Sequence, residues 1–393
     1  MLNINQLLAI TTLLTLTACA KNPVTGRQEL HFVSTDKEIK MGLENYQYGQ
    51  QASGGQYAVD PELTAYVQEV GQKLAKNSDR PDLPFEFVVL NDSVPNAWAL
   101  PGGKIAVNRG LLTHLENEAE LAAVLGHEIT HAAARHGAKA MERQIIMSTG
   151  LVAANVAIAA THKVTDPAYK DKALAASAAV ATGLISTKYS REAELEADSY
   201  GMDYMVKAGY SPEGAVSLQQ TFVKLMDKKS PNWVEGLFAS HPPSQERAST
   251  NQKRALKMPQ DLMLGKERYT QKTAKLKQHK AAYEAYDDGV KAYKKEEYAQ
   301  ALTLVNQAIT VVPEEALFYG LQGDVFTKQD HKDKAMNAYQ TAISKNPNYF
   351  YYYHQRGLLY EKMGKKTEAK ADLDKAQKWL PTETAAAALK KLA

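Results

Sequence analysis

Apolar residues recur along most of this chain at the spacing of helices, and at the spacing of strands in only a few short stretches. One helix is expected to open at the capping pattern Thr-Asp-Lys-Glu of residues 35–38. Another is expected after Pro61, and its apolar stripe comprises Leu63, Val67, Val70 and Leu74. Residues 85–90 indicate a strand, and residues 104–107 indicate the strand that returns after a turn. The pattern predicts a mainly α-helical domain with a small antiparallel sheet.

The stretch with the clearest chemistry lies in a helix expected over residues 119–134, which are rich in Ala, Leu and Val and contain no proline. It contains the pattern His-Glu-x-x-His. His127 and His131 are four residues apart and lie on one helical face, so both imidazoles can bind one metal ion. Glu128 can then act as general base on a bound water, as in zinc peptidases. The alternative, two structural histidines and a surface glutamate, weakens if a third ligand lies downstream.

A candidate third ligand lies in residues 190–198, whose pattern is Ser-Arg-x-x-Glu-x-x-Ala-Asp. Glu194 and Asp198 are four residues apart and share one helical face. Glu194 can complete a His, His, Glu zinc site, and Asp198 can accept the free N–H of a ligating histidine. Glu192 and Glu196 lie on other faces and are expected to be solvated. The alternative is an acidic surface helix with incidental spacing.

The two motifs, about 60 residues apart, resemble those of the gluzincin metallopeptidases, a family that includes HtpX, the CAAX prenyl protease and BepA. Further segments that match soluble bacterial members are residues 22–27, 96–103, 190–191 and 240–243. The resemblance covers about residues 22–250. It implies a zincin-like α+β domain that hydrolyses peptide bonds, a zinc-dependent metalloendopeptidase of the EC 3.4.24 type, with one Zn2+ per chain.

By position, the resemblance makes His127, His131 and Glu194 the zinc ligands. It makes Glu128 the general base and Asp198 the residue that orients a ligand. Zinc lowers the pKa of a bound water from 15.7 toward about 7. Glu128 would take the proton of that water and deliver it to the leaving amine.

The resemblance also implies an edge strand beside the cleft, formed by Lys104, Ile105, Ala106 and Val107. An extended substrate would add to this strand through main-chain hydrogen bonds, which suits a protease that acts on unfolded segments.

The donor that stabilises the oxyanion is not identified by the sequence, and His241 and Arg247 are the candidates. By resemblance, His241 could also close the open coordination position of the zinc and so regulate the site. A helix-start histidine before Pro242 is the competing interpretation. His136 is five residues past His131, off the ligand face, and a surface or structural role is expected for it.

Residues 145–185 are dominated by Ala, Ile, Val and Ser and predict a helical hairpin with a break at residues 161–171. One interpretation is a membrane-leaning lid beside the active site. We favour a packed helical pair, because each arm is short for a membrane span.

The N-terminus has the features of a lipoprotein signal peptide over residues 1–18. An apolar run precedes Leu-Thr-Ala-Cys, and Cys19 is the only cysteine in the chain, so lipidation at Cys19 is expected. The first six residues lack Lys and Arg, which departs from the usual signal, and an ordinary secreted protein is the alternative. Ala20, not Asp, follows the cysteine. By resemblance to Gram-negative lipoproteins, this implies a periplasmic protein anchored in the inner leaflet of the outer membrane.

A chain of 393 residues is too long for one compact core, and the net charge of +3 gives no reason to expect a nucleic-acid partner. Residues 251–280 carry nine Lys or Arg against two Asp or Glu, and a solvated basic linker is expected there, with a tether to an anionic membrane as the alternative. Four sets of small residues and prolines then recur at a spacing of 34: Gly289, Gly323 and Gly357; Ala301, Ala335 and Ala369; Ala308, Ala342 and Ala376; Pro313, Pro347 and Pro381. This period resembles tetratricopeptide repeats.

We therefore expect a metallopeptidase domain over residues 19–250, the linker, and three tetratricopeptide repeats with a capping helix over residues 281–393. The tyrosine-rich run at 349–353 either lines a peptide groove or packs between helices. The predicted function is cleavage of unfolded or misassembled envelope proteins, and the resemblance implies outer-membrane protein quality control of the BepA type. The repeats would recruit substrates or an outer-membrane assembly machine. The alternative is a repeat-based chaperone or scaffold with a largely latent peptidase domain.

Overall fold

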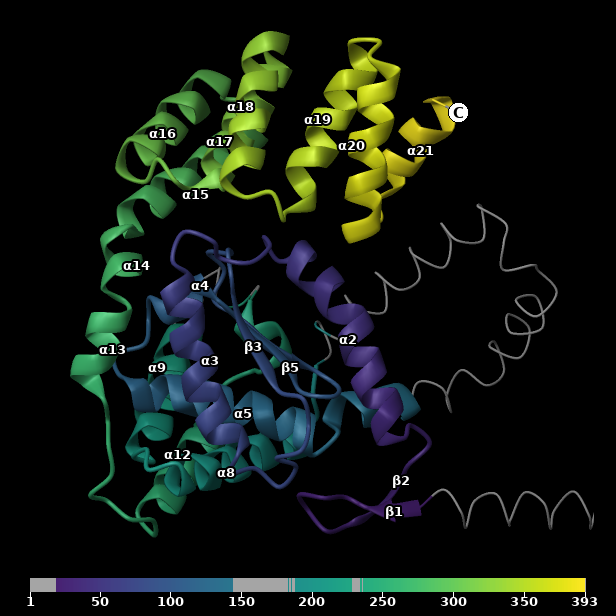
Figure 1. Cartoon of the computed structure of the whole chain (residues 1–393). Helices are drawn as coiled ribbons and strands as arrows, with labels where there is room; N and C mark the ends of the chain where they lie inside the picture. Colours follow the sequence, from purple (N-terminus) through teal and green to yellow (C-terminus); the bar gives the residue numbers. More distant parts are fainter. Residues whose placement is uncertain are drawn as a thin grey trace, which may run out of the picture.

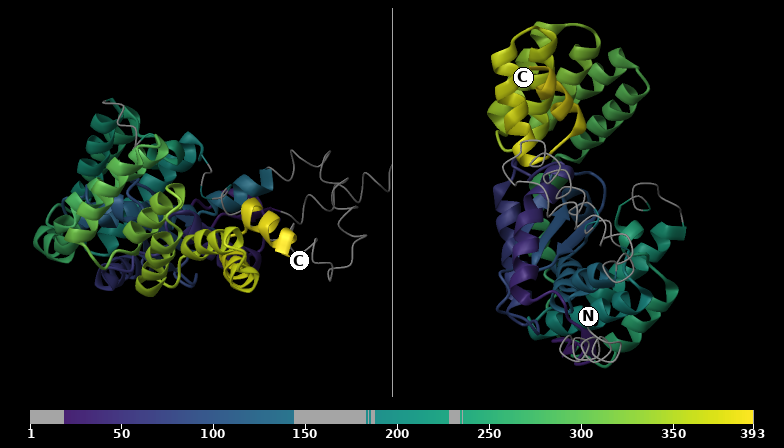
Figure 2. Two further views of the ribbon diagram at one scale, coloured as in Figure 1. Left: turned by 90° about the horizontal axis from the view of Figure 1, so that it is seen from above. Right: turned by 90° about the vertical axis from the view of Figure 1, so that its right-hand side faces the viewer.

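The computed structural model describes residues 19–143, 183, 185, 188–227, 234 and 236–392. These residues are mostly helical, with two small sheets. Figure 1 shows the C-terminal helix pairs at one end of the peptidase domain and the N-terminal strands at the opposite end, and the side view in Figure 2 agrees. The predicted helical hairpin at 145–185 and the predicted signal peptide lie outside the described residues, apart from residues 183 and 185.

The N-terminal segment forms a short hairpin and two helices. Its elements are β1 (Cys19–Lys21), β2 (Gln28–Leu30), α2 (Thr35–Ala52) and α3 (Pro61–Ala75). Strands β1 and β2 pair in antiparallel fashion. The side chain of Ser34 caps α2 by accepting a hydrogen bond from the Lys37 amide, so the cap lies one residue before the predicted start. The predicted stripe of α3 is buried.

The central sheet has three strands: β3 (Glu86–Leu90), β4 (Ala97–Leu100) and β5 (Lys104–Asn108). Their order is β3-β5-β4, with β5 parallel to β3 and antiparallel to β4. The predicted antiparallel pairing is confirmed for β4 with β5 and is wrong for β3 with β5. After β4, a turn with positive φ at Gly102 and Gly103 returns the chain between β4 and β3. Residues Lys104–Val107 were predicted to form an edge strand. This prediction is wrong, because β5 pairs with a strand on each side.

The remaining peptidase helices surround this sheet. They are α4 (Arg109–Leu112), α5 (Glu118–Ala133), α8 (Arg191–Lys207), α9 (Glu213–Asp227), α11 (Leu237–Ser240) and α12 (Gln245–Ala255). Every residue of α5 except His127 is buried, and α5 contacts α3, α8, α9 and β4. The helix with the His-Glu-x-x-His motif is thus the centre of the domain. Within the residues described, no helix is long and apolar enough to cross a membrane.

The C-terminal third consists of helix pairs, as the 34-residue period predicts. Its helices are α13 (Lys266–Lys272), α14 (Ala274–Gln278), α15 (Lys280–Lys294), α16 (Tyr298–Val311), α17 (Ala316–Lys328), α18 (Lys332–Lys345), α19 (Phe350–Lys362), α20 (Lys366–Trp379) and α21 (Glu383–Leu392). The repeated prolines follow α16, α18 and α20, and α21 forms the capping helix. Tyr352 and Tyr353 are buried, which favours helix packing over a peptide groove.

The basic segment before the repeats is not a solvated linker throughout. Tyr269 of α13 is fully buried and donates a hydrogen bond to the Leu112 carbonyl at 2.6 Å, and Leu276 of α14 is also fully buried. Each short helix therefore inserts one large apolar side chain into the core. The lysines of this segment remain on the outside, which explains the basic composition.

Polar contacts join the repeats to the peptidase domain. Asn91, which follows β3, donates to the Glu315 carboxylate at 3.0 Å, and Ser93 donates to Asp287 at 2.9 Å. The guanidinium of Arg109 lies 3.4 Å from the ring centroid of Tyr283. The first repeat is thereby fixed to the end of the central sheet.

Candidate metal centre

Helices α5 and α8 approach each other closely at a pair of glycines. A Cβ atom at Gly126 would lie 2.9 Å from the Gly201 carbonyl oxygen, and a Cβ at Gly201 would lie equally close to the Gly126 backbone. Only glycine fits at both positions, so the helix axes can come nearer than larger side chains allow. This contact brings the first turns of α8, with Glu194, opposite His127 and His131 on α5.

Three predicted ligands meet at one point. The Nε2 atoms of His127 and His131 are 3.0 Å apart. The Glu194 carboxylate lies 3.5 Å from His127 Nε2 and 3.4 Å from His131 Nε2. His241 joins them, since ligand atoms of all four side chains lie within 4.8 Å of one another. The sequence therefore predicted the positions that the fold brings together.

The spacing of these atoms fits a zinc ion. Ligands at 2.0–2.1 Å from a tetrahedral zinc are separated by about 3.3 Å, which matches the observed separations. The other ring nitrogen of each histidine on α5 has its own partner, Asp198 for His127 and His136 for His131, which leaves both Nε2 atoms for the metal. His127, His131 and Glu194 can hold Zn2+, which as a Lewis acid polarises a water molecule and a substrate carbonyl.

Asp198 contacts the first candidate ligand, His127. Its Oδ1 atom lies 2.9 Å from His127 Nδ1. Arg247 donates to both Asp198 oxygens at 2.7 Å and also lies 2.7 Å from a Glu194 oxygen. Burial alone would raise the pKa of Asp198, but the Arg247 charge and its hydrogen bonds lower that pKa to about 2. Arg247 thus directs most of its donors to two carboxylates of the centre.

Glu128 has the surroundings of a general base. It is 1% exposed, and its Oε2 atom has no hydrogen-bond partner among the described residues. Burial raises the pKa of Glu128 above the ordinary value of a glutamate. A higher pKa makes the carboxylate a better proton acceptor near neutral pH, which is what proton transfer from an attacking water requires.

His241 lies inside the centre. Its Nδ1 atom is 2.9 Å from a Glu194 oxygen and 3.2 Å from His127 Nε2, and its Nε2 atom is 3.7 Å from Glu128. The residue follows α11 directly, whereas the next helix is capped by Ser244, so the helix-start interpretation is wrong. His241 is therefore close enough to the other three side chains to serve as a fourth ligand.

Two predictions about neighbouring residues are corrected. His136 was expected away from the ligands, but it is 4% exposed and its Nδ1 atom lies 2.8 Å from His131 Nδ1. Helix α5 ends before it, and Arg135 adopts a left-handed φ of 62°, so the chain turns His136 back toward the site. Glu196 was expected to be solvated, but it contacts His136 and Arg27. Glu192 is exposed, as predicted.

Tyr189 was not singled out by the sequence, although it precedes the second motif. Its ring stacks on that of His131 with centroids 3.9 Å apart. Aromatic stacking of this kind fixes the plane of the imidazole, but no spacing rule connects residues so far apart in the chain.

Two other residues from the sequence analysis lie away from the metal centre. Cys19 begins β1, and Lys104 of β5 is buried, with its ammonium group 2.9 Å from the Glu86 carboxylate.

Comparisons with known proteins agree with this centre. Residues 61–255 match the family described as "Peptidase family M48", and residues 323–364 and 350–382 match tetratricopeptide repeat families. The metalloprotease YcaL of Escherichia coli K12 is 31% identical over 263 residues, which are 63% of this chain and 96% of that protein. The beta-barrel assembly-enhancing protease of the same strain is 26% identical over 346 residues, 81% of this chain and 69% of that protein. A Vibrio cholerae relative is 32% identical over 203 residues, and the chain covers 40% of its length.

The match to YcaL spans nearly the whole of that metalloprotease, and the matched family region contains all the candidate zinc ligands. The repeat matches fall on α17 to α20. This chain therefore belongs to peptidase family M48 and is a zinc metalloendopeptidase with C-terminal tetratricopeptide repeats.

Proposed function

We propose that this protein is a periplasmic, lipid-anchored protease that cleaves unfolded or misassembled envelope proteins. The observation that carries this proposal is the combination, on one chain, of the metal centre with a repeat array fixed against the peptidase domain. Relatives named beta-barrel assembly-enhancing protease support the envelope and the outer-membrane assembly machinery as its setting.

Each residue of the metal centre has its own role in the proposed reaction. His127, His131 and Glu194 bind the zinc ion, and Asp198 with Arg247 keeps His127 and Glu194 in position. Glu128 accepts a proton at its free Oε2 from the attacking water and later returns it to the leaving nitrogen.

The edge strand β4 (Ala97–Leu100) takes the substrate-binding role that the sequence assigned to β5. Among the described strands it lies at the edge of the sheet, and it contacts α5. An extended peptide that pairs with β4 would be bound mainly through its backbone, so many unfolded sequences would be accepted.

His241 restrains the resting enzyme in this proposal. A catalytic zinc site keeps one position open for water and substrate, and His241 lies where it would occupy that position. The same contact favours the second candidate function, a repeat-based chaperone or scaffold in which the peptidase is mostly latent.

The anchor fits the shape of the molecule. Cys19 begins β1 at the end of the peptidase domain that is remote from the repeats (Figures 1 and 2). A lipid on Cys19 would therefore attach the peptidase end to the membrane and direct the repeats toward the periplasm, where they can bind proteins.

The test compares the purified chain from Ala20 onward with Glu128→Gln and His241→Ala, by zinc content and by cleavage of unfolded casein. We expect one zinc in each form, no cleavage by Glu128→Gln, and faster cleavage by His241→Ala. Stoichiometric zinc without cleavage by any form would favour the scaffold. In a deletion strain, full rescue by Glu128→Gln would also favour the scaffold, whereas rescue by the wild type alone supports proteolysis.

A further inference from the structure

The two histidine ligands of α5 are supported in different ways. The Nδ1–H group of His127 donates a hydrogen bond directly to the Asp198 carboxylate, at 2.9 Å. Among the described residues, no carboxylate contacts the Nδ1 atom of His131. Instead, that atom lies 2.8 Å from Nδ1 of His136, a second and almost fully buried imidazole. The second ligand therefore depends on a histidine that the zinc-binding motifs do not include.

The direction of these hydrogen bonds follows from the metal. With Nε2 of His131 directed to the zinc ion, the proton of this ring is on Nδ1. Two nitrogens at 2.8 Å share one proton, so Nδ1 of His136 is the acceptor and His136 carries its own proton on Nε2. That Nε2–H is directed to the Glu196 carboxylate, 3.2 Å away.

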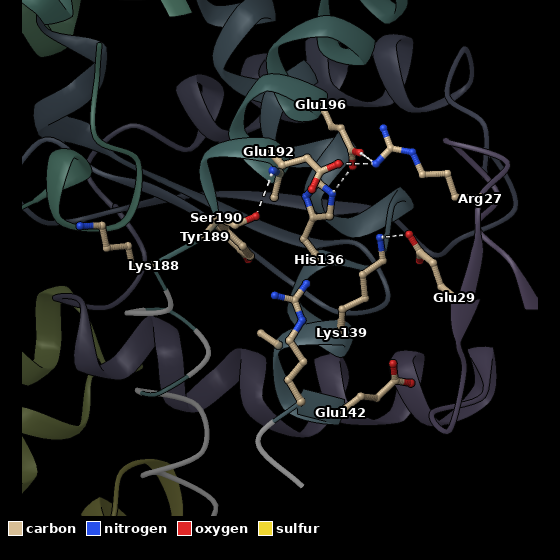
Figure 3. Close-up of a pocket in the computed structure, with 13 residues that line it drawn as sticks. Arg27, Glu29, His136, Lys139, Glu142, Lys188, Tyr189, Ser190, Glu192 and Glu196 are labelled. Atoms are coloured by element: carbon tan, nitrogen blue, oxygen red, sulfur yellow. Dashed lines mark hydrogen bonds and ion pairs between the residues drawn. The ribbon is translucent and has the colours of Figure 1, made fainter. Parts of the chain in front are cut away.

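Arg27 of the N-terminal segment ends the chain of contacts. Its guanidinium lies 2.9 Å from the second Glu196 oxygen, and it also pairs with Glu192. Figure 3 shows His136 directed toward Glu196, with Arg27 reaching the same carboxylate from the opposite side. The Glu196 side chain is 13% exposed, so the contacts run from the buried ligand to the surface.

Other contacts fix the segment that carries His136. The Asn22 side chain donates to the Ala134 carbonyl at 2.9 Å, and Glu29 pairs with Lys139 at 2.7 Å. Both partners flank His136, and both contacts come from the same N-terminal segment as Arg27. The β1–β2 hairpin and its turn thus contact the chain on both sides of His136.

We propose that His136 and Glu196 are positioning residues that orient the zinc ligand His131, and that Arg27 of the N-terminal hairpin completes this relay. The inference rests on the metal centre alone. It does not depend on the substrate, the location or the anchoring proposed above.

Zinc affinity of the full chain, measured by competition with a chromophoric chelator, tests the relay. We expect His136→Phe and Glu196→Gln to weaken zinc binding by about 10–100-fold, the usual effect of losing a partner of a metal ligand. Glu192→Gln is the matched control. It removes a carboxylate from the same helix and from the same arginine but does not contact His136, so zinc affinity should equal that of the wild type.

Two further results separate positioning from a purely structural role. His136→Gln retains an acceptor and a donor and should recover most of the lost affinity, while the zinc-free variants keep the wild-type melting temperature. The Glu196→Gln change should have no added effect in the His136→Phe background, because Glu196 acts through His136. In the zinc-loaded wild type, imidazole 15N spectra should place the His136 proton on Nε2.

Wild-type zinc affinity in both His136→Phe and Glu196→Gln would overturn the proposal. So would a His136 proton on Nδ1 in the zinc-loaded wild type, a measurement that needs no variant to fold. Because neither readout involves catalysis, an inactive protein with the expected affinities would contradict the proposed proteolysis and leave the relay standing.

Discussion

Gly126 and Gly201 lie so close that a Cβ atom on either would come within 2.9 Å of the backbone of the other. This contact determines the distance between α5, which carries two histidine ligands, and α8, which carries Glu194. The spacing of the metal centre thus depends on two glycines, neither of which has a side chain that could contact the metal.

The variant Gly201→Ala should weaken both the fold and the metal centre. Its methyl group would meet rigid backbone, not the end of a flexible side chain, so the two helices must move apart. Overpacking of this kind costs about 1–3 kcal/mol. We expect a lower melting temperature and weaker zinc binding, measured by thermal unfolding and by chelator competition.

The matched control is Gly137→Ala, in the segment that follows α5. A Cβ at Gly137 would meet its nearest neighbour, the Pro101 ring, at 3.5 Å, which is an ordinary contact. This variant should unfold and bind zinc as the wild type does. Equal losses in both variants would argue against a specific role of the glycine pair.

The ligands could be predicted because helical periodicity is local. Four-residue spacing alone places His127 with His131 on one face, and likewise Glu194 with Asp198. The crossing at Gly201 could not be predicted in the same way, because a glycine inside a helix does not reveal its partner. The position of His136 depends on the left-handed conformation of Arg135, and the residue types in this segment do not predict that conformation.

The repeats illustrate the same limit on a larger scale. The recurrence of Gly289, Gly323 and Gly357 predicted the helix pairs, since each repeat must pack against the next. The strand order was not predictable, because strands 104–107 and 85–90 are equally apolar and either could occupy the centre of a sheet. The contact between Arg109 and Tyr283 joins separate domains and has no signal in either motif.

Zinc binding should stabilise the protein by mass action. A ligand that binds only the folded state at 100 times its dissociation constant adds about 2.7 kcal/mol. Chelation should therefore lower the melting temperature of the wild type but not that of Glu194→Gln, which lacks one charged ligand. An unchanged melting temperature of the wild type after complete zinc removal would contradict this prediction.

Asp324 should make the repeats less stable at higher pH. It is buried on α17 and accepts hydrogen bonds from Tyr339 and Tyr351. Burial raises the pKa of Asp324 to about 7, whereas in the unfolded chain it is about 3.9. The folded state therefore binds the proton more tightly, and its contribution to stability is complete below about pH 4 and is lost as the pH rises through 7.

The measurement is urea unfolding at pH 5 and pH 8, followed by a probe in the repeats. The free energy of unfolding should fall between these values in the wild type, by at most about 1.4 kcal/mol per pH unit. Asp324→Asn should reduce this fall, because it removes the titrating group. Asp330→Asn, at an exposed position with left-handed φ that Asn tolerates, should leave it unchanged.

Arg109→Met should loosen the repeats from the peptidase domain. The Arg109 side chain donates to Asn91 and Ser93 at 2.7 Å and covers the Tyr283 ring, so its loss removes contacts on both sides of the interface. The loss should be about 1–3 kcal/mol. Faster amide hydrogen exchange in α15, without a change in α20, would show that the first repeat is held less tightly against the peptidase domain.

The variant Arg109→Met should also alter the active site. The loop that Arg109 holds continues to Pro95, whose carbonyl accepts a hydrogen bond from Leu237 at the start of α11, the helix that precedes His241. We expect casein cleavage by Arg109→Met to rise, because His241 would leave the metal more readily. Lys291→Met, which removes only an exposed ion pair on α15, is the control. Faster exchange in α15 with unchanged cleavage would show that the repeats and the metal centre are not coupled through this loop.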